Sequence, residues 1–271
     1  MAGSLTPGGR DGPRIASLVP SLTELVVALG LGARLVARTG FCIRPAEAVR
    51  EVPKVGGTKD VNLAKLRRLA PTHVLVNIDE NRRETVDAIR AWPPDERPEI
   101  VVTHPCAPQE VAALIARLAG RFGQVTGVAQ QAAALIGELR LELGRTRADG
   151  RGRQRVLYLI WREPWMTVAR DTYIAQLLAC VGWHTWPAAS GGDSGAARYP
   201  VVRGDEAWLA DIDRVLLSSE PYRFDASHMA AAQALCPRAR VQLVDGEALS
   251  WYGARTAAGL RYLRTLADAA A

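Results

Sequence analysis

The sequence lacks any long hydrophobic run. No apolar stretch among its 271 residues approaches the roughly 20 residues that a membrane-spanning helix needs. The opening residues, MAGSLTPGGRDGPR, contain no apolar core of the kind found in an export signal. We therefore expect no membrane insertion and, for the sequence as printed, a cytoplasmic protein. A longer natural start would instead place it in the periplasm or at the cell surface.

Cysteine and histidine are scarce and scattered. Cys42, Cys106, Cys180 and Cys236 show none of the short spacings of zinc knuckles or redox pairs, so we expect four reduced thiols. The four histidines form no H-x-x-x-H or H-E-x-x-H pattern. His104 and Cys106 are two residues apart and offer two candidate metal ligands, but the prediction that the pattern favours is no metal site.

Lysine is rare in a chain that is nevertheless basic. Lys54, Lys59 and Lys65 are the three lysines among 34 basic residues, and the net charge is +6. The arginines are spread along the chain without interleaved aromatic residues, which disfavours nucleic-acid binding. A net positive charge still favours an anionic small ligand.

Motifs of common enzymes and nucleotide-binding proteins are missing. No G-x-S-x-G surrounds Ser21, Ser218 or Ser219, and Ser21 is better explained as a helix cap. The glycine pairs within residues 55–57 and 190–192 lack the Walker lysine and the Rossmann spacing. These absences disfavour a serine hydrolase and a nucleotide-binding protein.

The sequence does show a regular alternation of strand-like and helical patterns. This alternation indicates βαβ units and a mostly parallel sheet, which binds ligands at the carboxyl ends of its strands. In the first half we expect strands at 14–19, 34–39, 72–77 and 99–104, and helices at 24–32, 63–71, 79–92 and 108–121.

A long helical pattern interrupts the alternation at residues 125–147, which predict one continuous helix of about 20 residues, near 30 Å long. After it we expect strands at 155–160, 214–219 and 240–246, and helices at 171–182, 205–212, 226–235 and 256–270. The predicted fold class is α/β, with two α/β lobes joined by one long backbone helix. The predicted parts are a tail at 1–13, an N-terminal lobe at 14–122, the linking helix at 123–150 and a C-terminal lobe at 151–271.

Large polar and aromatic residues follow several predicted strands. Tryptophan and arginine together suit a large, flat, anionic ligand, because rings stack on indoles and carboxylates pair with guanidinium groups. The alternative is that Trp161 and Trp165 pack the core and that Arg170 and Asp171 form a structural pair. The candidates are Phe41, Asn77, Glu80, Asn81 and Arg82 in the first lobe, and Trp161, Arg162, Trp165, Arg170, Asp171, Tyr199, Trp251, Tyr252 and Arg255 in the second.

Three stretches carry a resemblance to a known family. They are RIASLVPSLTELVVALGLGARLVARTGFCIRP, VPKVGGTKDVNLAKLRRLAPTHVLV and VQLVDGEALSWYGARTAAGLRYL. Together they resemble the cobalamin- and iron-siderophore-binding proteins of bacterial ABC importers, the helical-backbone metal receptor superfamily, over about residues 14 to 267.

The resemblance implies a binding protein, not an enzyme, in which two lobes and a rigid backbone helix hold a metal chelate between the lobes. It implies a corrinoid or a ferric siderophore as ligand, no covalently bound cofactor, and an ABC permease as a possible partner. We further expect a monomer. Pro20, Ser21 and Cys42 lie in the matched stretches and complete the predicted ligand-binding set.

Two departures separate the chain from typical transport members. Such members carry a Glu on each lobe that docks on the permease; the matching positions here are Ala64 and, in the second lobe, Asp205 with Glu206 beside it. A tryptophan that cobalamin-binding members carry is replaced by Gly57 and Thr58. The missing docking Glu, together with the lack of an export signal, suggests a cytosolic relative that binds, senses or hands over its ligand. The missing tryptophan disfavours cobalamin itself, and a corrinoid or another metal chelate remains the expected ligand.

Two other functions stay open. One is a cytosolic enzyme that reuses the two-lobed fold, with His104, Cys42, Glu80 and Asp171 as acid, base or nucleophilic groups. The other is an interaction protein with a filled, apolar cleft. Fold alone does not choose among these functions.

Overall fold

The computed structural model describes residues 12–146 and 152–269. Most of the predicted tail at 1–13, residues 147–150 of the predicted linker, and residues 151, 270 and 271 of the predicted C-terminal lobe therefore lie outside the described residues. The chain divides into two compact units. Unit 1 runs to His104 and includes Ala112–Gly137, while unit 2 comprises Pro105–Val111 and the chain from Glu138 onward.

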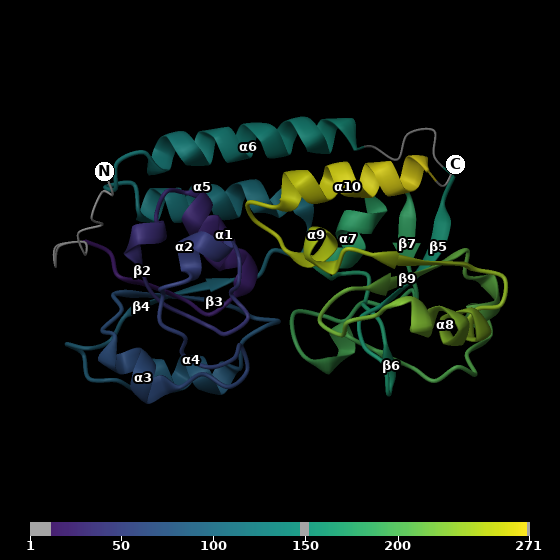
Figure 1. The fold of residues 1–271 in the computed structure, drawn as a ribbon, viewed down its shortest axis with the longest axis horizontal. Helices are drawn as coiled ribbons and strands as arrows, with labels where there is room; N and C mark the ends of the chain where they lie inside the picture. Colours follow the sequence, from purple (N-terminus) through teal and green to yellow (C-terminus); the bar gives the residue numbers. More distant parts are fainter. Residues whose placement is uncertain (1–11, 147–151, 270–271) are drawn as a thin grey trace. The chain divides into compact units, whose positions relative to one another are not determined.

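Unit 1 is a four-stranded parallel sheet in the order β2 (Leu35–Arg38), β1 (Ile15–Ser17), β3 (His73–Asn77) and β4 (Glu99–Thr103). Helices α1 (Pro20–Ala28) and α5 (Val111–Arg121) cover one face, and α3 (Leu63–Arg68) and α4 (Arg83–Arg90) cover the other (Figure 1). A short helix, α2, spans Ala46–Val49. Because both faces are covered, all three residues of the central strand β1, Ile15, Ala16 and Ser17, are buried.

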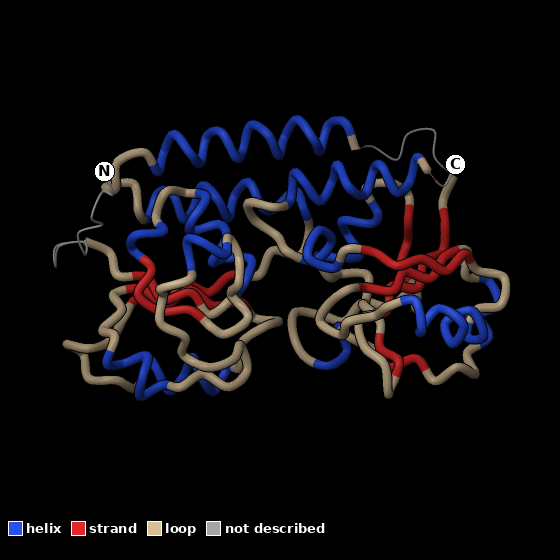
Figure 2. The backbone as a smooth tube through the Cα atoms, viewed as in Figure 1, coloured by secondary structure: helices blue, strands red, loops and turns tan. Residues whose placement is uncertain are grey.

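Unit 2 holds a second parallel sheet, ordered β10 (Arg240–Val244), β9 (Arg214–Ser218), β5 (Gln154–Leu159) and β7 (Trp183–Thr185). Helices α7 (Tyr173–Ala179) and α10 (Thr256–Asp268) lie on one face and α8 (Met229–Leu235) on the other, with α9 at Gly246–Ser250. A separate antiparallel ribbon joins β6 (Trp165–Met166) to β8 (Val201–Val202). Figure 2 shows the strands of these sheets in red.

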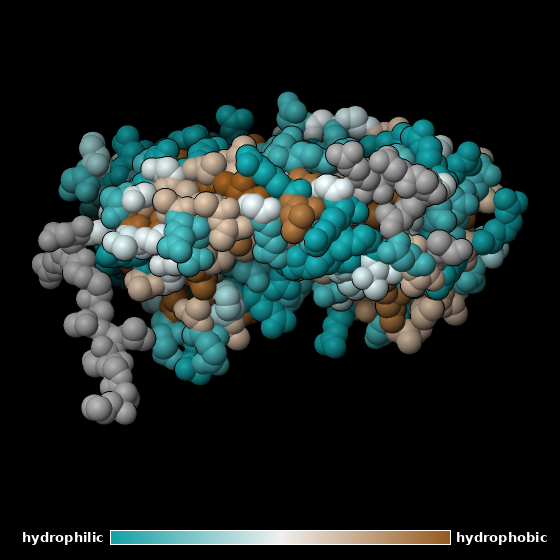
Figure 3. All heavy atoms as spheres, turned by 90° about the horizontal axis from the view of Figure 1, so that it is seen from above, coloured by the Kyte–Doolittle hydropathy of each residue, from teal (hydrophilic) through white to brown (hydrophobic). Residues whose placement is uncertain are grey.

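The long helix predicted at 125–147 is α6, which spans Val128–Arg145 without a break. Within unit 2, Glu142 on α6 is almost fully buried and pairs with Arg264 at 2.9 Å, Arg261 at 3.6 Å and Arg145 at 3.2 Å. These ion pairs fasten the second half of α6 to α10. Hydrophilic residues cover most of the face seen in Figure 3, with smaller hydrophobic patches between them.

Several predicted helix boundaries are wrong. Ser21 does not cap α1, because the helix already begins at Pro20, with Val19 as the N-cap residue and no side-chain cap. The helix predicted from residue 79 begins at Arg83, and the one predicted at 205–212 is a 3-10 turn at Ala207–Asp211. Other 3-10 turns span Gly32–Arg34, Pro108–Glu110, Ala196–Arg198 and Ala226–His228. None of the described helices is long and apolar enough to cross a membrane.

Candidate functional site

Each sheet has a point where neighbouring central strands send their connections to opposite faces. In unit 1 these strands are β1 and β3, followed by α1 and α4; in unit 2 they are β5 and β9, followed by α7 and α8. Loops that diverge in this way leave a crevice outside the carboxyl ends of the strands, where open α/β sheets bind ligands. We call the two regions the strand-end face of unit 1 and the strand-end face of unit 2.

Two asparagines hold the loops of the unit 1 face together. Asn81 is 6% exposed, its Oδ1 accepts a hydrogen bond from the Asn77 amide at 2.9 Å, and its Nδ2 donates to the carbonyls of Leu18 at 3.1 Å and Thr58 at 3.0 Å. Asn77 Oδ1 accepts from the amides of Asp79 and Glu80. The side chains of both predicted ligand residues therefore hydrogen-bond to loops of their own unit. Because residues 77–81 form hydrogen-bonded turns, α4 begins only at Arg83.

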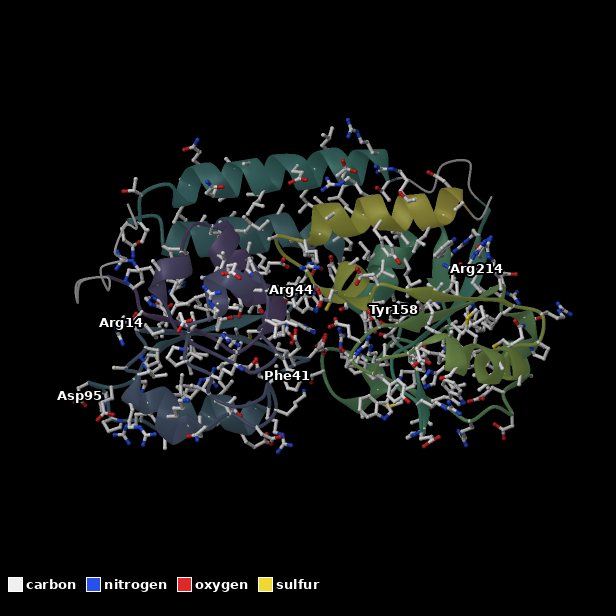
Figure 4. The ribbon with its side chains drawn as sticks, in the orientation of Figure 1. Arg14, Phe41, Arg44, Asp95, Tyr158 and Arg214 are labelled. Atoms are coloured by element: carbon white, nitrogen blue, oxygen red, sulfur yellow. The ribbon has the colours of Figure 1, made fainter. Side chains whose placement is uncertain are left out.

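Exposed apolar side chains lie on the same face. Phe41 is 64% exposed, Ile43 is 48% exposed and Ile78 is 42% exposed. Figure 4 places Phe41 and Arg14 at opposite ends of the unit 1 sheet. A Cβ added to Gly57 would lie 3.3 Å from Cε2 of Phe41, so the Phe41 ring lies over the position where family members were expected to carry a tryptophan. The sequence prediction included Phe41 and omitted both isoleucines, which adjoin Cys42 and Asn77.

The remaining predicted residues of unit 1 differ in access to solvent. Cys42 is fully buried, and burial raises the pKa of its thiol, which disfavours a nucleophilic role. Pro20 is buried, and the buried Ser21 hydroxyl has no hydrogen-bond partner among the described residues. Arg82 is exposed and pairs with Asp60 at 3.4 Å, and Glu80 is partly exposed.

His104 lies beside acidic and basic groups and not beside a metal-ligand set. Its Nε2 is 3.3 Å from Asp79 Oδ2, and Lys59 donates to the Asp79 carbonyl at 2.8 Å. Burial lowers the pKa of Lys59, partly offset by Glu80 and Asp79. Among the residues that the structure describes, no group of three or more His, Cys, Asp or Glu side chains could hold a metal ion.

Aromatic rings from two loops meet on the unit 2 face. Trp161, 42% exposed, packs edge-on against Tyr222 with centroids 5.6 Å apart, and Trp165 stacks on Phe224 at 5.9 Å. The amide of Tyr222 donates to the Ile160 carbonyl at 3.3 Å, which ties the loop after β9 to the loop after β5. We call Trp161, Trp165, Tyr222 and Phe224 the aromatic cluster.

The sequence prediction missed Tyr222 and Phe224. A signal for them exists, because the Glu-Pro-aromatic pattern of residues 163–165 recurs at 220–222. Tyr222 is also braced from behind: its hydroxyl is 3.1 Å from His228 Nε2, and His228 Nδ1 is 2.9 Å from Asp225 Oδ1.

Arg162 and Arg170, which both follow β5, have different surroundings. The guanidinium of Arg162 lies 5.4 Å from the Trp165 ring centroid, beside the aromatic cluster. Arg170 donates to the Thr185 carbonyl at 3.2 Å and lies over the Trp186 ring at 5.5 Å. Arg162 therefore lies beside the aromatic cluster, whereas Arg170 fastens the loop beside β7.

The glycine-rich loop at residues 190–192 binds the side chain of Asp171. Its carboxylate accepts from the amides of Gly191 and Gly192 at 2.8 Å each and from the Ser190 hydroxyl. Desolvation acts to raise the pKa of Asp171, but these hydrogen bonds outweigh it and lower the pKa. The loop at 190–192 thus binds a carboxylate of its own chain, as a phosphate-binding loop would bind its ligand.

The other predicted residues of unit 2 are largely internal. Trp251 and Tyr252 are buried, the Trp251 indole donates to Glu220 at 2.7 Å, and Arg255 pairs with Glu247 at 3.1 Å. Tyr199 is half-buried beside Arg198. Glu206, a candidate docking residue, accepts hydrogen bonds from two backbone amides of its own turn, while Asp205 is exposed.

Comparison with known proteins identifies the fold. No family model matches the chain, and no curated protein sequence matches it significantly. The periplasmic vitamin B12 binding protein BtuF of Vibrio cholerae superposes with a TM-score of 0.76 at 20% identity, covering 95% of this chain and 97% of that one.

Two haem-binding proteins are similar to the same degree. A periplasmic heme binding protein from Pseudomonas aeruginosa gives a TM-score of 0.75 at 22% identity, with 95% of this chain and 93% of that chain covered. The periplasmic heme-binding protein RhuT from Roseiflexus sp. RS-1, in apo form, gives 0.73 at 23%, with 96% and 100% covered. The chain therefore has the two-lobed α/β fold of these binding proteins, as the resemblance implied.

Proposed function

We propose that this protein is a binding protein for a metal chelate, such as a corrinoid, haem or a ferric siderophore. It holds the chelate without transforming it. The observation that carries the proposal is the aromatic cluster beside Arg162 at the carboxyl ends of β5 and β9. Phe224 is buried and supports the cluster from the core, while the 42% exposed ring of Trp161 can stack on a flat macrocycle. The guanidinium group of Arg162 complements an acidic group.

The fold and the unit 1 face support the same proposal. Proteins of this fold bind vitamin B12 and haem according to the names of the structural neighbours. Phe41, Ile43 and Ile78 expose apolar surface at the carboxyl ends of strands. Single exposed apolar side chains are ordinary on a protein surface, but a group of them at one edge indicates a binding site.

Thermal unfolding with a ligand panel tests the proposal. The panel is cyanocobalamin, cobinamide, haem, ferric siderophores and the metal ions alone. A ligand present at about 100 times its dissociation constant stabilises the folded state by about 2.7 kcal/mol, which raises the melting temperature by a few degrees. A shift with a chelate but not with its metal supports the proposal, and recovery of the unchanged ligand distinguishes binding from turnover. If no panel member shifts the transition, the chelate proposal fails.

Matched variants locate the site. Trp161→Ala removes an exposed ring of the aromatic cluster and should weaken the binding of the active chelate by about tenfold or more, given an aromatic contact energy of about 1 kcal/mol plus the lost buried area. Leu141→Ala removes an exposed side chain from α6 and should leave binding unchanged. Equal affinity of Trp161→Ala and wild type would remove the aromatic cluster from the site.

Delivery to a partner is a second part of the proposal. An ABC permease is the partner class that the resemblance implies, and the exposed Asp205 is the residue best placed to pair with permease arginines, because the Glu206 carboxylate is bonded within its own turn. Ala64, in α3, supplies no charge at the corresponding position of unit 1.

A further inference from the structure

A pocket of about 390 Å³ lies on the β6–β8 ribbon of unit 2, lined by residues 162–165 and 201–203. Backbone hydrogen bonds fix the positions of the segments that line the pocket. Trp165 pairs with Val202 across the ribbon, and the Met166 amide donates to the Trp161 carbonyl at 3.1 Å, closing the turn that carries Arg162. The pocket therefore lies on the β6–β8 ribbon and the turn at 161–166, and it shares Trp165 with the aromatic cluster.

The lining combines apolar walls with two guanidinium groups. Pro164, Trp165 and the two valines of β8 supply the apolar surface, and Val201 is 48% exposed. Arg162 and Arg203 supply two positive charges against the single carboxylate of Glu163. Glu163 lies 3.8 Å from Arg162 but is highly exposed, and exposed ion pairs contribute little, so the pair competes weakly with an anionic ligand.

The side chain of Arg162 and the backbone of Arg203 are held by neighbouring groups. Arg162 lies over the Trp165 ring, and that ring is braced by its stacking on Phe224. The backbone at Arg203 is fixed by the Glu206 carboxylate, which accepts from the Arg203 amide at 2.9 Å and the Gly204 amide at 2.8 Å. Desolvation acts to raise the pKa of Glu206, but these amides outweigh it and lower the pKa, so the bracing carboxylate is ionised at neutral pH.

We propose that this pocket binds a carboxylate-bearing peripheral arm of the chelate, and that the protein therefore selects chelates with free carboxylates over neutral ones. The inference rests on the proposed function. A guanidinium fork matches the two oxygens of a carboxylate, and the apolar walls suit the carbon chain that carries it. The volume is near the lower end for small-molecule pockets, which fits a side arm and not a whole macrocycle.

The test compares chelates that differ in their carboxylates alone. Haem is titrated against haem dimethyl ester, and a monocarboxylic acid derivative of cyanocobalamin against cyanocobalamin itself. Wild type should bind the acids about tenfold tighter, the ratio expected for a charge-assisted hydrogen bond. Arg162→Gln and Arg203→Gln should each move the ratio of acid affinity to ester or amide affinity toward one.

Arg238→Gln is the matched control, because Arg238 is exposed in the turn before β10, at the opposite end of the unit 2 sheet. It should keep the full preference for the acids. Arg162→Lys separates charge from fork geometry and should restore part of the preference. Circular dichroism confirms that every variant is folded.

The outcomes separate this inference from the proposed function. If wild type binds acid and ester equally, the carboxylate pocket is refuted and the chelate-binding function stands. If no chelate binds, the proposed function fails, and the pocket is then tested with benzoate against benzamide by tryptophan fluorescence. Benzoate binding that Arg162→Gln or Arg203→Gln weakens supports an anion pocket, whereas equal responses to benzoate and benzamide overturn it.

Discussion

The role of Asn81 yields the sharpest prediction about the unit 1 face. Its buried amide makes three hydrogen bonds, one accepted from Asn77 and two donated to the carbonyls of Leu18 and Thr58. Asn81→Ala deletes all three and leaves their partners buried. With about 1 kcal/mol net for each bond, the free energy of unfolding should fall by about 3 kcal/mol.

A loss of this size should be visible in both thermal and urea unfolding. For a protein of this length each kcal/mol shifts the melting temperature by about 2–4 °C, so the transition of unit 1 should fall by about 6 °C or more. The two units need not unfold together, and a tryptophan signal for each unit, from Trp92 or from the unit 2 tryptophans, separates their transitions. Gln130→Ala, an exposed amide on α6, is the control and should change stability by less than about 0.5 kcal/mol.

Ligand binding distinguishes the alternative role of Asn81. If Asn81 acts by holding the loops in place, Asn81→Ala should lower both the free energy of unfolding and the affinity for the chelate. If Asn81→Ala kept its full unfolding free energy and lost chelate affinity, Asn81 would be a direct ligand contact and the reasoning from its hydrogen bonds would be refuted.

Two further predictions concern unit 2 and the thiols. Glu142→Gln removes a carboxylate that is buried between three partly exposed arginines, so stability at pH 7 should fall by about 2 kcal/mol. Desolvation acts to raise the pKa of Glu142, but Arg264 and the other arginines outweigh it and lower the pKa below the unfolded value. The contribution of Glu142 is therefore complete above about pH 4.3 and is lost as the pH falls, so urea unfolding of wild type and variant should converge in acid; a constant difference down to pH 2 contradicts the ion pairs. Alkylation followed by mass spectrometry should show that the partly exposed Cys106 and Cys180 react in the folded protein, whereas the buried Cys42 and Cys236 react only after unfolding. Modification of Cys42 in the folded protein would show that the loop after β2 opens.

Much of the fold could be predicted because its signals are local and repeated. The parallel strands β1, β3, β5 and β9 are buried on both faces, so each appears as a short apolar run between helical patterns. The segment that forms α6 is rich in alanine and leucine and has no proline, which predicted a single helix. The strands β6, β7 and β8 have two or three residues each, too few for a period-2 pattern to appear.

The site was less predictable, because a polar side chain at a strand end can either contact a ligand or hydrogen-bond to a neighbouring loop. Asn77, Asn81 and Asp171 are polar and follow strands, as ligand residues do, yet their side chains bind backbone amides and carbonyls of neighbouring loops. Trp251 and Tyr252 are aromatic, yet they are buried. Pairing of the loops after β5 and β9 brings Tyr222 to Trp161, a contact 61 residues apart in the chain that no local pattern specifies.

The most direct test of chelate binding is an equilibrium titration of wild type and Trp161→Ala, followed by absorbance, with haem, cyanocobalamin and a ferric siderophore. Leu141→Ala serves as the control. The account predicts saturable binding of at least one chelate by wild type and by Leu141→Ala, and an affinity at least about tenfold lower for Trp161→Ala. Saturable binding that is identical in all three proteins would contradict the assigned site, and no binding by wild type would contradict the function itself.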